Sequence, residues 1–393
     1  MSVYGIVSEF NPFHRGHEYL ISCAKQMGAG AVVCVMSGNA TQRAEMAIID
    51  KYMRAEAAVF GGADLVLELP FPWSSSSAEG FASAAIHILA SFCDTVLFGS
   101  ECGDIALLES IAEYVSGEQF KEKFSQMLEA GEQSAGAYLS LIELEFRVKL
   151  ASNDILGVEY IKAAKTLGVS LNFVTVKRQG SAYLCKEKSD TGFDSAMALR
   201  KMLSSGDDID GMKDRLPKRS FELLLDAKSR GKITSTTKFG ECARTFFRML
   251  PSESLTPCAE CEGGVLERIC KVAHQSSSAD DFWNRLSTKR YTDAKLRRAV
   301  LFSMCGVLKS DIKQMPSYTL LLGANKVGRE VLSDKKKTKN IEVITKPADV
   351  SELCGKNEKR QAELDRRLSS LYSLCLDSSE ATGDIIKKKP YIT

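Results

Sequence analysis

Two histidines three residues apart offer the clearest chemistry in the chain. They occur in the run His14-Arg15-Gly16-His17, and the whole sequence of 393 residues holds only four histidines. The run follows an apolar stretch over residues 2–8, which predicts a buried strand, and it leads into a predicted helix. A helix start presents unpaired N–H groups and the positive end of the helix dipole, so a strand–turn–helix of this kind is suited to bind phosphate.

Two imidazoles on one side of that turn suit attack on the α-phosphorus of ATP. Such a reaction needs donors aimed at the charge that builds up on the phosphoryl oxygens and on the departing pyrophosphate. Gly16 leaves room for a nucleotide against the backbone, and no side-chain nucleophile is required. We therefore take His14 and His17 as the candidate catalytic residues.

Competing sites are weaker. Gly28-Ala29-Gly30 precedes a predicted strand and lacks a third glycine, which argues against a dinucleotide-binding fingerprint, and no Gly-x4-Gly-Lys-Ser/Thr loop occurs. Cys258 and Cys261 have the spacing of metal ligands, but Cys270 and His274 make a poor second pair. We expect no metal site there.

A parallel sheet must position the histidine run. Nearly all-apolar strands are predicted over residues 2–8, 31–36, 64–69 and 95–98, and helices over 16–26, 46–60 and 77–92 alternate with them. Strands that are apolar throughout are typical of a sheet covered by helices on both faces. The pattern predicts an α/β fold with a Rossmann-like, doubly wound parallel sheet.

The rest of the chain divides near residue 205. Residues 105–164 are predicted to be helical with a turn at 152–154, a strand follows at 171–177, and a helix begins at 195–202. Beyond residue 205 we expect few strands and mainly amphipathic helices, over 217–228, 292–307 and 355–377. The prediction is a catalytic domain over residues 1–205 and a mainly α-helical domain over residues 206–393.

Charge is distributed unevenly between these halves. The net charge of +2 combines −8 over residues 1–200 with +10 over residues 201–393. A basic half suits a polyanion such as RNA. The apolar runs are too short for a membrane span and no signal peptide is visible, so we expect a cytoplasmic protein without membrane contact.

His-x-Gly-His after a first strand is the signature of a nucleotidyltransferase superfamily. The wider run Gly5-Ile6-Val7-Ser8-Glu9-Phe10-Asn11-Pro12-Phe13-His14-Arg15-Gly16-His17 resembles the opening of the bacterial tRNA(Met) cytidine acetate ligase family. Further blocks resemble that family in order, at residues 36–39, 42–45, 63–70, 98–104, 152–157, 177–183, 262–268, 290–292 and 322–329. The likeness extends to about residue 335.

This resemblance implies an enzyme that uses ATP, with Mg²⁺, to activate acetate as acetyl-adenylate and releases pyrophosphate. It would then pass the acetyl group to N4 of the wobble cytidine of elongator tRNA(Met), releasing AMP. By resemblance, the second domain would bind tRNA, and the ATP-binding residues are Val7, Ser8, Glu9, Phe10, Asn11, Pro12, Phe13, His14, Arg15, Gly16, His17, Glu18, Tyr19, Leu20, Gly99, Asn153 and Arg178.

Further basic or hydroxyl side chains are candidates for phosphate or tRNA contacts: Lys51, Arg54, Ser195, Arg200, Lys289 and Arg290. Lys51 and Arg54 lie one turn apart, where they either add positive charge near the site or form a solvated helix face. We predict no protein partner.

Two other functions stay open. A small-molecule adenylyltransferase would share the histidine mechanism but would join AMP to a phosphate. A nucleotide-regulated RNA-binding protein would use the site only for control. The length of the second half favours a macromolecular substrate. An assay of tRNA binding distinguishes the ligase from the adenylyltransferase. An assay of acetate-dependent pyrophosphate exchange distinguishes the ligase from the RNA-binding protein.

Overall fold

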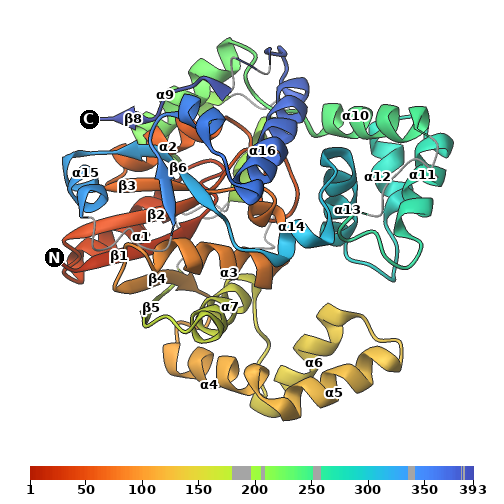
Figure 1. Ribbon diagram of the computed structural model, residues 1–393, viewed down its shortest axis with the longest axis horizontal. Coiled ribbons are helices and arrows are strands. Elements are labelled where there is room, and N and C mark those ends of the chain that lie inside the picture. The colour runs from red at the N-terminus through yellow and green to blue at the C-terminus, as the bar shows by residue number, and fades with distance from the viewer. Residues whose placement is uncertain (179–195, 205–208, 251–257, 335–340, 382, 384–385) are drawn as a thin grey trace.

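The centre of the molecule is an eight-stranded sheet (Figure 1). The computed structural model describes residues 1–178, 196–204, 209–250, 258–334, 341–381, 383 and 386–393. The strands are β1 (Val3–Ser8), β2 (Ala31–Ser37), β3 (Leu65–Leu69), β4 (Thr95–Ser100), β5 (Asn172–Lys177), β6 (Tyr318–Ala324), β7 (Glu342–Ile344) and β8 (Tyr391–Ile392).

Five strands of the first half run parallel, in the order β3-β2-β1-β4-β5. The chain winds outward from β1 in one direction through β2 and β3, and in the other through β4 and β5. This is the order of a doubly wound Rossmann-like sheet, in which ligands bind beyond the carboxyl ends of the strands where the direction reverses. The predicted fold class is confirmed, and the reversal lies between β1 and β4.

Three strands of the second half extend the same sheet. β6 pairs antiparallel with β3, and β7 and β8 pair parallel with β6. All seven residues of β6 are buried, although no strand is predicted there from the sequence. The second half is mainly helical, as predicted, but it is joined to the sheet of the first. The boundary near residue 205 falls at the edge of the undescribed residues 205–208 and stays a prediction.

Helices cover both faces of the sheet. Residues from α3 (Ala78–Leu89), α4 (Ile105–Ser116) and α7 (Ser152–Leu167) share one core with the strands. Residues from α1 (Arg15–Gln26) and α2 (Lys51–Phe60) share a second core on the other face. α2 begins at residue 51, later than the predicted residue 46, because the Asp50 carboxylate accepts the N–H groups of Tyr52 and Met53 and caps the helix there.

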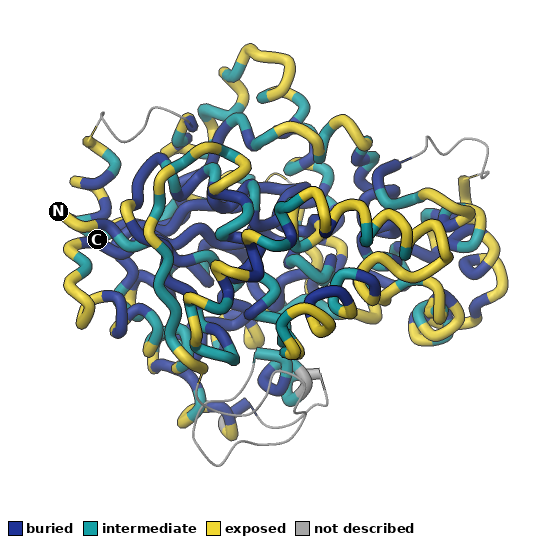
Figure 2. Tube along the Cα trace, turned by 90° about the horizontal axis from the view of Figure 1, so that it is seen from below, coloured by how far each residue is buried: buried dark blue, intermediate teal, exposed yellow. Residues whose placement is uncertain are grey.

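Two helical units project from this body (Figure 1). One, which we call the arm, comprises α4 with α5 (Glu118–Glu129) and α6 (Ser134–Phe146). The other, the helical lobe, comprises α10 (Thr236–Met249), α11 (Val265–Gln275), α12 (Ala279–Leu286) and α13 (Asp293–Cys305). Figure 2 shows buried positions concentrated in the strands and their flanking helices, and exposed positions along the outlying helices.

The remaining helices lie around the sheet edge and the lobe. They are α8 (Ala196–Ser204), α9 (Lys218–Ser229), α14 (Lys309–Lys313), α15 (Lys326–Ser333) and α16 (Lys356–Cys375). The lobe and α16 share a core with Ala40, Ala44 and Met46 of the loop between β2 and α2. No helix within the described ranges combines the length and apolarity needed to cross a bilayer.

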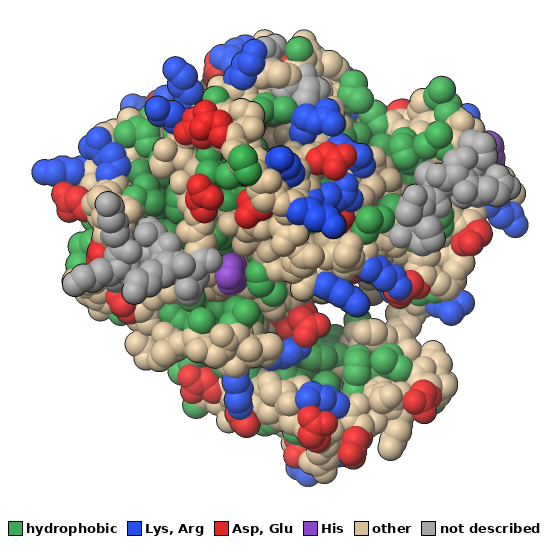
Figure 3. Space-filling model, in the orientation of Figure 1, with side chains coloured by type: hydrophobic (Ala, Val, Ile, Leu, Met, Phe, Trp, Pro, Cys, Tyr) green, Lys and Arg blue, Asp and Glu red, His purple; other side chains and the backbone are tan. Residues whose placement is uncertain are grey.

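The arm and the lobe approach each other at their tips. The Gln133 side-chain amide, at the start of α6, donates to the carbonyl oxygen of Lys289, which follows α12. Figure 3 shows a deep hollow between the arm and the rest of the molecule, with Lys and Arg side chains on the body above it.

Candidate active site

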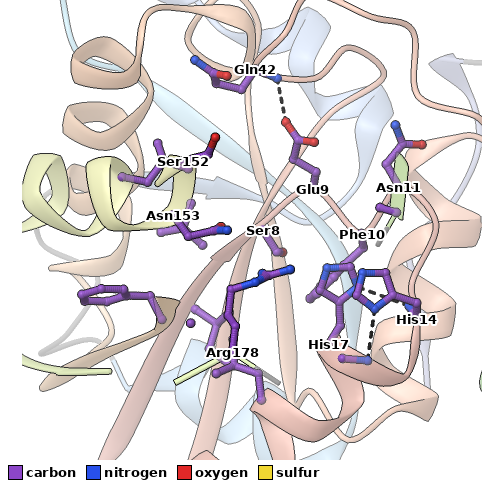
Figure 4. A pocket seen from close by; sticks show the side chains of 18 of the residues that line it. Ser8, Glu9, Phe10, Asn11, His14, His17, Gln42, Ser152, Asn153 and Arg178 are labelled. Atoms are coloured by element: carbon purple, nitrogen blue, oxygen red, sulfur yellow. Dashed lines mark hydrogen bonds between the residues drawn. The ribbon is translucent and has the colours of Figure 1, made fainter. Parts of the chain in front are cut away.

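A cavity of about 360 Å³ lies at the carboxyl ends of β1, β4 and β5 (Figure 4). This is the point where the strand order reverses, and therefore where the fold places ligands. The residues that line it are Ile6, Val7, Ser8, Glu9, Phe10, Asn11, His14, Gly16, His17, Tyr19, Leu20, Gln42, Arg43, Ala78, Phe81, Phe98, Gly99, Ser152, Asn153, Ile155, Leu156, Tyr160, Val176, Lys177, Arg178, Ala196, Met197 and Arg200.

His14 and His17 form the N-terminal cap of α1. Nδ1 of His14 accepts the N–H of Gly16 at 3.1 Å, and Nδ1 of His17 accepts the N–H of His14 at 3.2 Å. The two rings stack with centroids 3.7 Å apart. A Cβ on Gly16 would lie 2.9 Å from Cε1 of His14, so a glycine is needed between the histidines.

These hydrogen bonds fix the tautomer of both rings. Burial, followed by the nearby charges of Arg178 and Arg200, lowers the pKa of His14 to about 3. Burial also lowers the pKa of His17 well below its ordinary value. A neutral imidazole that accepts at Nδ1 carries its proton on Nε2. Each ring therefore offers one neutral N–H donor, alongside the N-terminus of α1.

The turn before α1 holds these rings in place. Phe10 has a φ of 45°, a left-handed conformation that non-glycine residues adopt at a cost, and its side chain is buried. Its ring contacts those of His17 and Phe13 edge-on, with centroids 4.9 and 5.0 Å away. The strained turn thus carries the chain from β1 into α1 with the histidines facing the cavity.

Asn153 and Arg178 form the opposite wall (Figure 4). Asn153 lies in the first turn of α7, and its side-chain amide donates to Glu101 at 2.6 Å. Arg178 follows β5 and lies 3.8 Å from the same carboxylate. A Cβ on Gly99 would lie 3.3 Å from Cγ of Arg178, so the glycine allows Arg178 to lie close against β4.

Glu101 and Asp154 position this wall, and neither of them is among the predicted site residues. Glu101 accepts the main-chain N–H groups of Asn153 and Asp154, each at 3.2 Å. Asp154 in return accepts the N–H groups of Glu101 and Cys102, at 2.9 and 3.1 Å. Both residues belong to blocks that resemble the ligase family, which is the only sequence signal that could have identified them.

A third side of the cavity is formed by the loop between β2 and α2. Glu9 accepts the N–H of Gln42 at 2.8 Å. Arg200, on α8, donates to the carbonyl oxygen of Asn11 at 2.8 Å and lies 3.7 Å from Glu45. The other oxygen of Glu45 lies 3.5 Å from Arg297 of the helical lobe. One carboxylate thus connects the cavity to the lobe.

The structure brings most of the predicted residues of the histidine segment to the cavity, together with Gly99, Asn153, Arg178 and Arg200. Pro12, Phe13, Arg15 and Glu18 belong to the segment without lining the cavity. Lys289 and Arg290 are exposed residues between α12 and α13. Ser195 lies outside the described residues.

Lys51 and Arg54 have structural contacts instead of the predicted phosphate contacts. The Lys51 ammonium is buried and lies 2.6 Å from the carboxylate of Glu68. The Arg54 guanidinium is fully buried and donates to main-chain carbonyl oxygens of Glu9, Ser37, Gly38 and Ile49. Neither residue lines the cavity, because the Lys51 charge is paired with Glu68 of β3 and the Arg54 charge holds the segments after β1 and β2 together.

The cysteine pair has no metal-like surroundings. Cys258 is buried, and Sγ of Cys261 contacts Oγ of Ser303 at 3.1 Å. Within the described ranges, no three His, Cys, Asp or Glu side chains lie close enough to hold a metal ion.

Known proteins resemble this chain over nearly its whole length. Residues 1–384 match the HIGH Nucleotidyl Transferase family. A tRNA(Met) cytidine acetate ligase of Acetivibrio thermocellus is 33% identical over 399 residues, or 95% of each chain, and one of Lysinibacillus sphaericus is 31% identical over 98% of each.

Two solved structures share the fold. Apo TmcAL of Thermotoga maritima matches with a TM-score of 0.92 at 30% sequence identity. The match covers 100% of this chain and 99% of the Thermotoga maritima chain. The same protein bound with alpha-thio ATP has a TM-score of 0.90 at 30% identity, with full coverage of both chains. Together with the histidine run and its cavity, these likenesses confirm the resemblance found in the sequence: the chain belongs to the tRNA(Met) cytidine acetate ligase family of HIGH nucleotidyl transferases.

Proposed function

We propose that this chain uses ATP to activate acetate as acetyl-adenylate, releases pyrophosphate, and passes the acetyl group to N4 of the wobble cytidine of elongator tRNA(Met). The observation that carries this proposal is the pair of neutral Nε2–H donors of His14 and His17, held at the N-terminus of α1 in the wall of the cavity. Donors placed in this way stabilise charge that develops on phosphoryl oxygens. The names of the relatives support the choice of acyl donor and acceptor.

The predicted residues take complementary roles in this reaction. His14 and His17 donate to phosphate oxygens, and Arg178 and Arg200 compensate the charge of the triphosphate. Gly99 and Asn153 contact the nucleotide from the carboxyl end of β4 and the first turn of α7. The alpha-thio ATP bound by the Thermotoga maritima protein supports a nucleotide at this site.

Magnesium would be bound mainly through the nucleotide. Mg²⁺ prefers oxygen ligands and keeps several of its waters when it binds phosphates. Among the described residues that line the cavity, Glu9 is the only carboxylate. We therefore assign the ion to phosphate oxygens and water, where it would offset negative charge on the triphosphate.

The basic second half supplies the expected contacts with tRNA. Residues 201–393 carry a net charge of +10, and charge of this sign favours a polyanion. Lys289 and Arg290, at the tip of the lobe where it meets the arm, are the first candidates. We propose that residues 1–205 carry out the nucleotide chemistry, that residues 206–393 bind most of the tRNA, and that the reaction takes place in the cytoplasm.

Mass analysis of elongator tRNA(Met) tests this function. The tRNA is incubated with the protein, ATP, Mg²⁺ and acetate, and nucleosides from the digested product are separated. We expect N4-acetylcytidine at the wobble position only when ATP and acetate are both present, with AMP and pyrophosphate as products. Unmodified tRNA under these conditions, with a folded protein, would contradict the proposal.

A further inference from the structure

Glu9 stands out in a cavity otherwise built for anions. It is the only carboxylate among the described residues lining the cavity, whereas Arg43, Lys177, Arg178 and Arg200 all line it. A carboxylate close to bound ATP and acetate disfavours both anions by repulsion. Its presence therefore calls for a step in which a negative side chain is useful.

The two oxygens of Glu9 have different surroundings. Oε1 accepts the N–H of Gln42 at 2.8 Å, which fixes the side chain. Within the described part of the chain, Oε2 has no hydrogen bond to the protein, and the residue lines the cavity. Burial raises the pKa of Glu9 above its ordinary value, which makes the carboxylate a stronger proton acceptor.

The main chain of Glu9 is also held firmly. Its carbonyl oxygen accepts a hydrogen bond of 2.6 Å from the buried guanidinium of Arg54. Arg54 donates as well to Ser37 at the end of β2. The carboxylate is therefore held by contacts at both its side chain and its backbone, as a group that must meet a substrate in one orientation.

Glu9 lies on the side of the cavity that faces the helical lobe. Figure 4 shows its side chain directed toward Gln42 and away from the histidine pair. The loop that contains Gln42 packs against the lobe through Ala44 and through the ion pair of Glu45 with Arg297. A nucleobase entering from the lobe would reach Glu9, while the phosphates would lie toward His14 and His17.

We propose that Glu9 is the general base of the acetyl-transfer step, an inference that rests on the proposed function. The N4 lone pair of cytidine is delocalised into the ring, so N4 is a weak nucleophile. As N4 bonds to the carbonyl carbon of acetyl-adenylate, one N4 proton passes to Oε2 of Glu9. The bond from that carbon to the phosphate oxygen breaks, AMP leaves with the electron pair, and Glu9 later releases the proton to water.

The Glu9→Gln variant separates the two half-reactions. Three rates are measured with the full-length protein: acetate-dependent ATP–pyrophosphate exchange, trapping of acetyl-adenylate by hydroxylamine, and single-turnover acetylation of elongator tRNA(Met). Because the neutral side chain no longer repels ATP and acetate, we expect exchange and trapping to be retained or raised, not lowered in step with acetylation. Acetylation of tRNA should fall by about 100- to 10,000-fold, the usual contribution of a general base.

Glu79→Gln serves as the matched control. Glu79 lies on α3 next to the lining residue Ala78, but its side chain is 66% exposed, is paired with Lys162, and does not line the cavity. This variant should match the unmodified protein in all three rates, and the thermal midpoints of both variants should agree within a few degrees.

The outcomes distinguish the two proposals. Normal tRNA acetylation by Glu9→Gln, or an equal loss of exchange and acetylation, would overturn the assignment of Glu9 as a base. An equal loss would indicate that Glu9 positions Arg43 or Arg200 for the first step. If the unmodified protein neither exchanges pyrophosphate with acetate nor acetylates tRNA, the proposed function itself is wrong.

Discussion

The main-chain N–H of His14 donates to Nδ1 of His17 across 3.2 Å, and the stacked rings lie only 3.7 Å apart. One turn of helix therefore sets the position, the tautomer and the protonation of both imidazoles. Two protonated rings at this separation would repel each other, and burial already disfavours the charged form. The pair acts through two neutral donors that need no reorganisation when charge develops on the nucleotide.

Replacing His17 should remove one of these donors. In His17→Asn we expect acetate-dependent ATP–pyrophosphate exchange to fall by about 100- to 1,000-fold, the usual cost of losing one donor to a developing oxyanion. His87→Asn is the control, because His87 lies on α3 and does not line the cavity. Unchanged exchange in a folded His17→Asn protein would contradict the assignment.

The stability of the protein should fall in acid partly through His14. Its pKa drops from 6.5 to about 3 in the folded protein, so below pH 6.5 the unfolded chain binds more protons than the native state. The native state then loses stability as the pH falls from 6.5 toward 3, by at most about 1.4 kcal/mol per pH unit. His14→Asn keeps a capping side chain without titrating. Its free energy of unfolding in urea should decline less steeply between pH 7 and pH 5, and parallel declines would contradict this account.

Loss of Glu101 should weaken nucleotide binding. Glu101→Ala removes the acceptor of three hydrogen bonds from the start of α7 and leaves Asn153 and Arg178 unsupported. Hydrogen bonds to a charged group contribute about 1.5–3 kcal/mol, so we expect the KM for ATP to rise about 10- to 100-fold with a smaller change in kcat. Glu113→Ala, whose side chain is 73% exposed in a pair with Lys165, should leave KM unchanged. A change in kcat alone would contradict a positioning role.

A larger residue at Gly157 should destabilise the protein. An added Cβ would lie 2.4 Å from the ring of Phe98, a cavity residue in β4, so Gly157→Ala should lower the free energy of unfolding by about 1–3 kcal/mol. Gly136 in α6 has nothing within 4 Å of an added Cβ, and there alanine should stabilise by about 0.5–1 kcal/mol. Urea denaturation of both variants checks the difference, and equal effects would contradict it.

The lobe tip should contribute to tRNA binding. In Lys289→Glu/Arg290→Glu we expect weaker binding of elongator tRNA(Met) and a shallower dependence on salt, because each phosphate contact that is lost removes about 0.7–0.9 from the slope of log K against log [salt]. Lys326→Glu/Arg329→Glu reverses two exposed charges on α15, at the far edge of the sheet (Figure 1). If Lys289→Glu/Arg290→Glu binds tRNA with the same affinity and salt dependence as this control, the lobe tip makes no phosphate contact.

The sequence predicts local features well where one stretch of chain decides them. The strands at residues 2–8 and 171–177 and the helix at 16–26 agree with β1, β5 and α1 to within about one residue. The N-terminal cap of α1 is equally local, since His14 and His17 lie within four consecutive residues. In these parts, neighbouring residues alone determine the apolar periodicity and the start of the helix.

Long-range partners are what the sequence leaves undetermined. Lys51 and Arg54 have the spacing of an exposed basic face. In the structure both are buried: Lys51 is paired with Glu68, and Arg54 donates to four main-chain carbonyl oxygens. Glu101 and Asp154 lie 53 positions apart, and neither has a local pattern that indicates their mutual hydrogen bonds. β6 is an apolar run of seven residues, and periodicity alone cannot tell such a run from a buried helical segment. Its pairing with β3, which is distant in sequence, makes it a strand.

The pairing of β3 with β6 has a consequence for biosynthesis. Leu65 pairs with Ala324, so the catalytic sheet is not complete until most of the chain has left the ribosome. Until then β3, whose residues are apolar except for Glu68 and are all buried in the finished fold, is an open edge, a state that invites association with other chains. The nucleotide site can therefore be assembled early from β1, β4 and β5, while protection of the far edge of the sheet must await the return of the chain from the helical lobe.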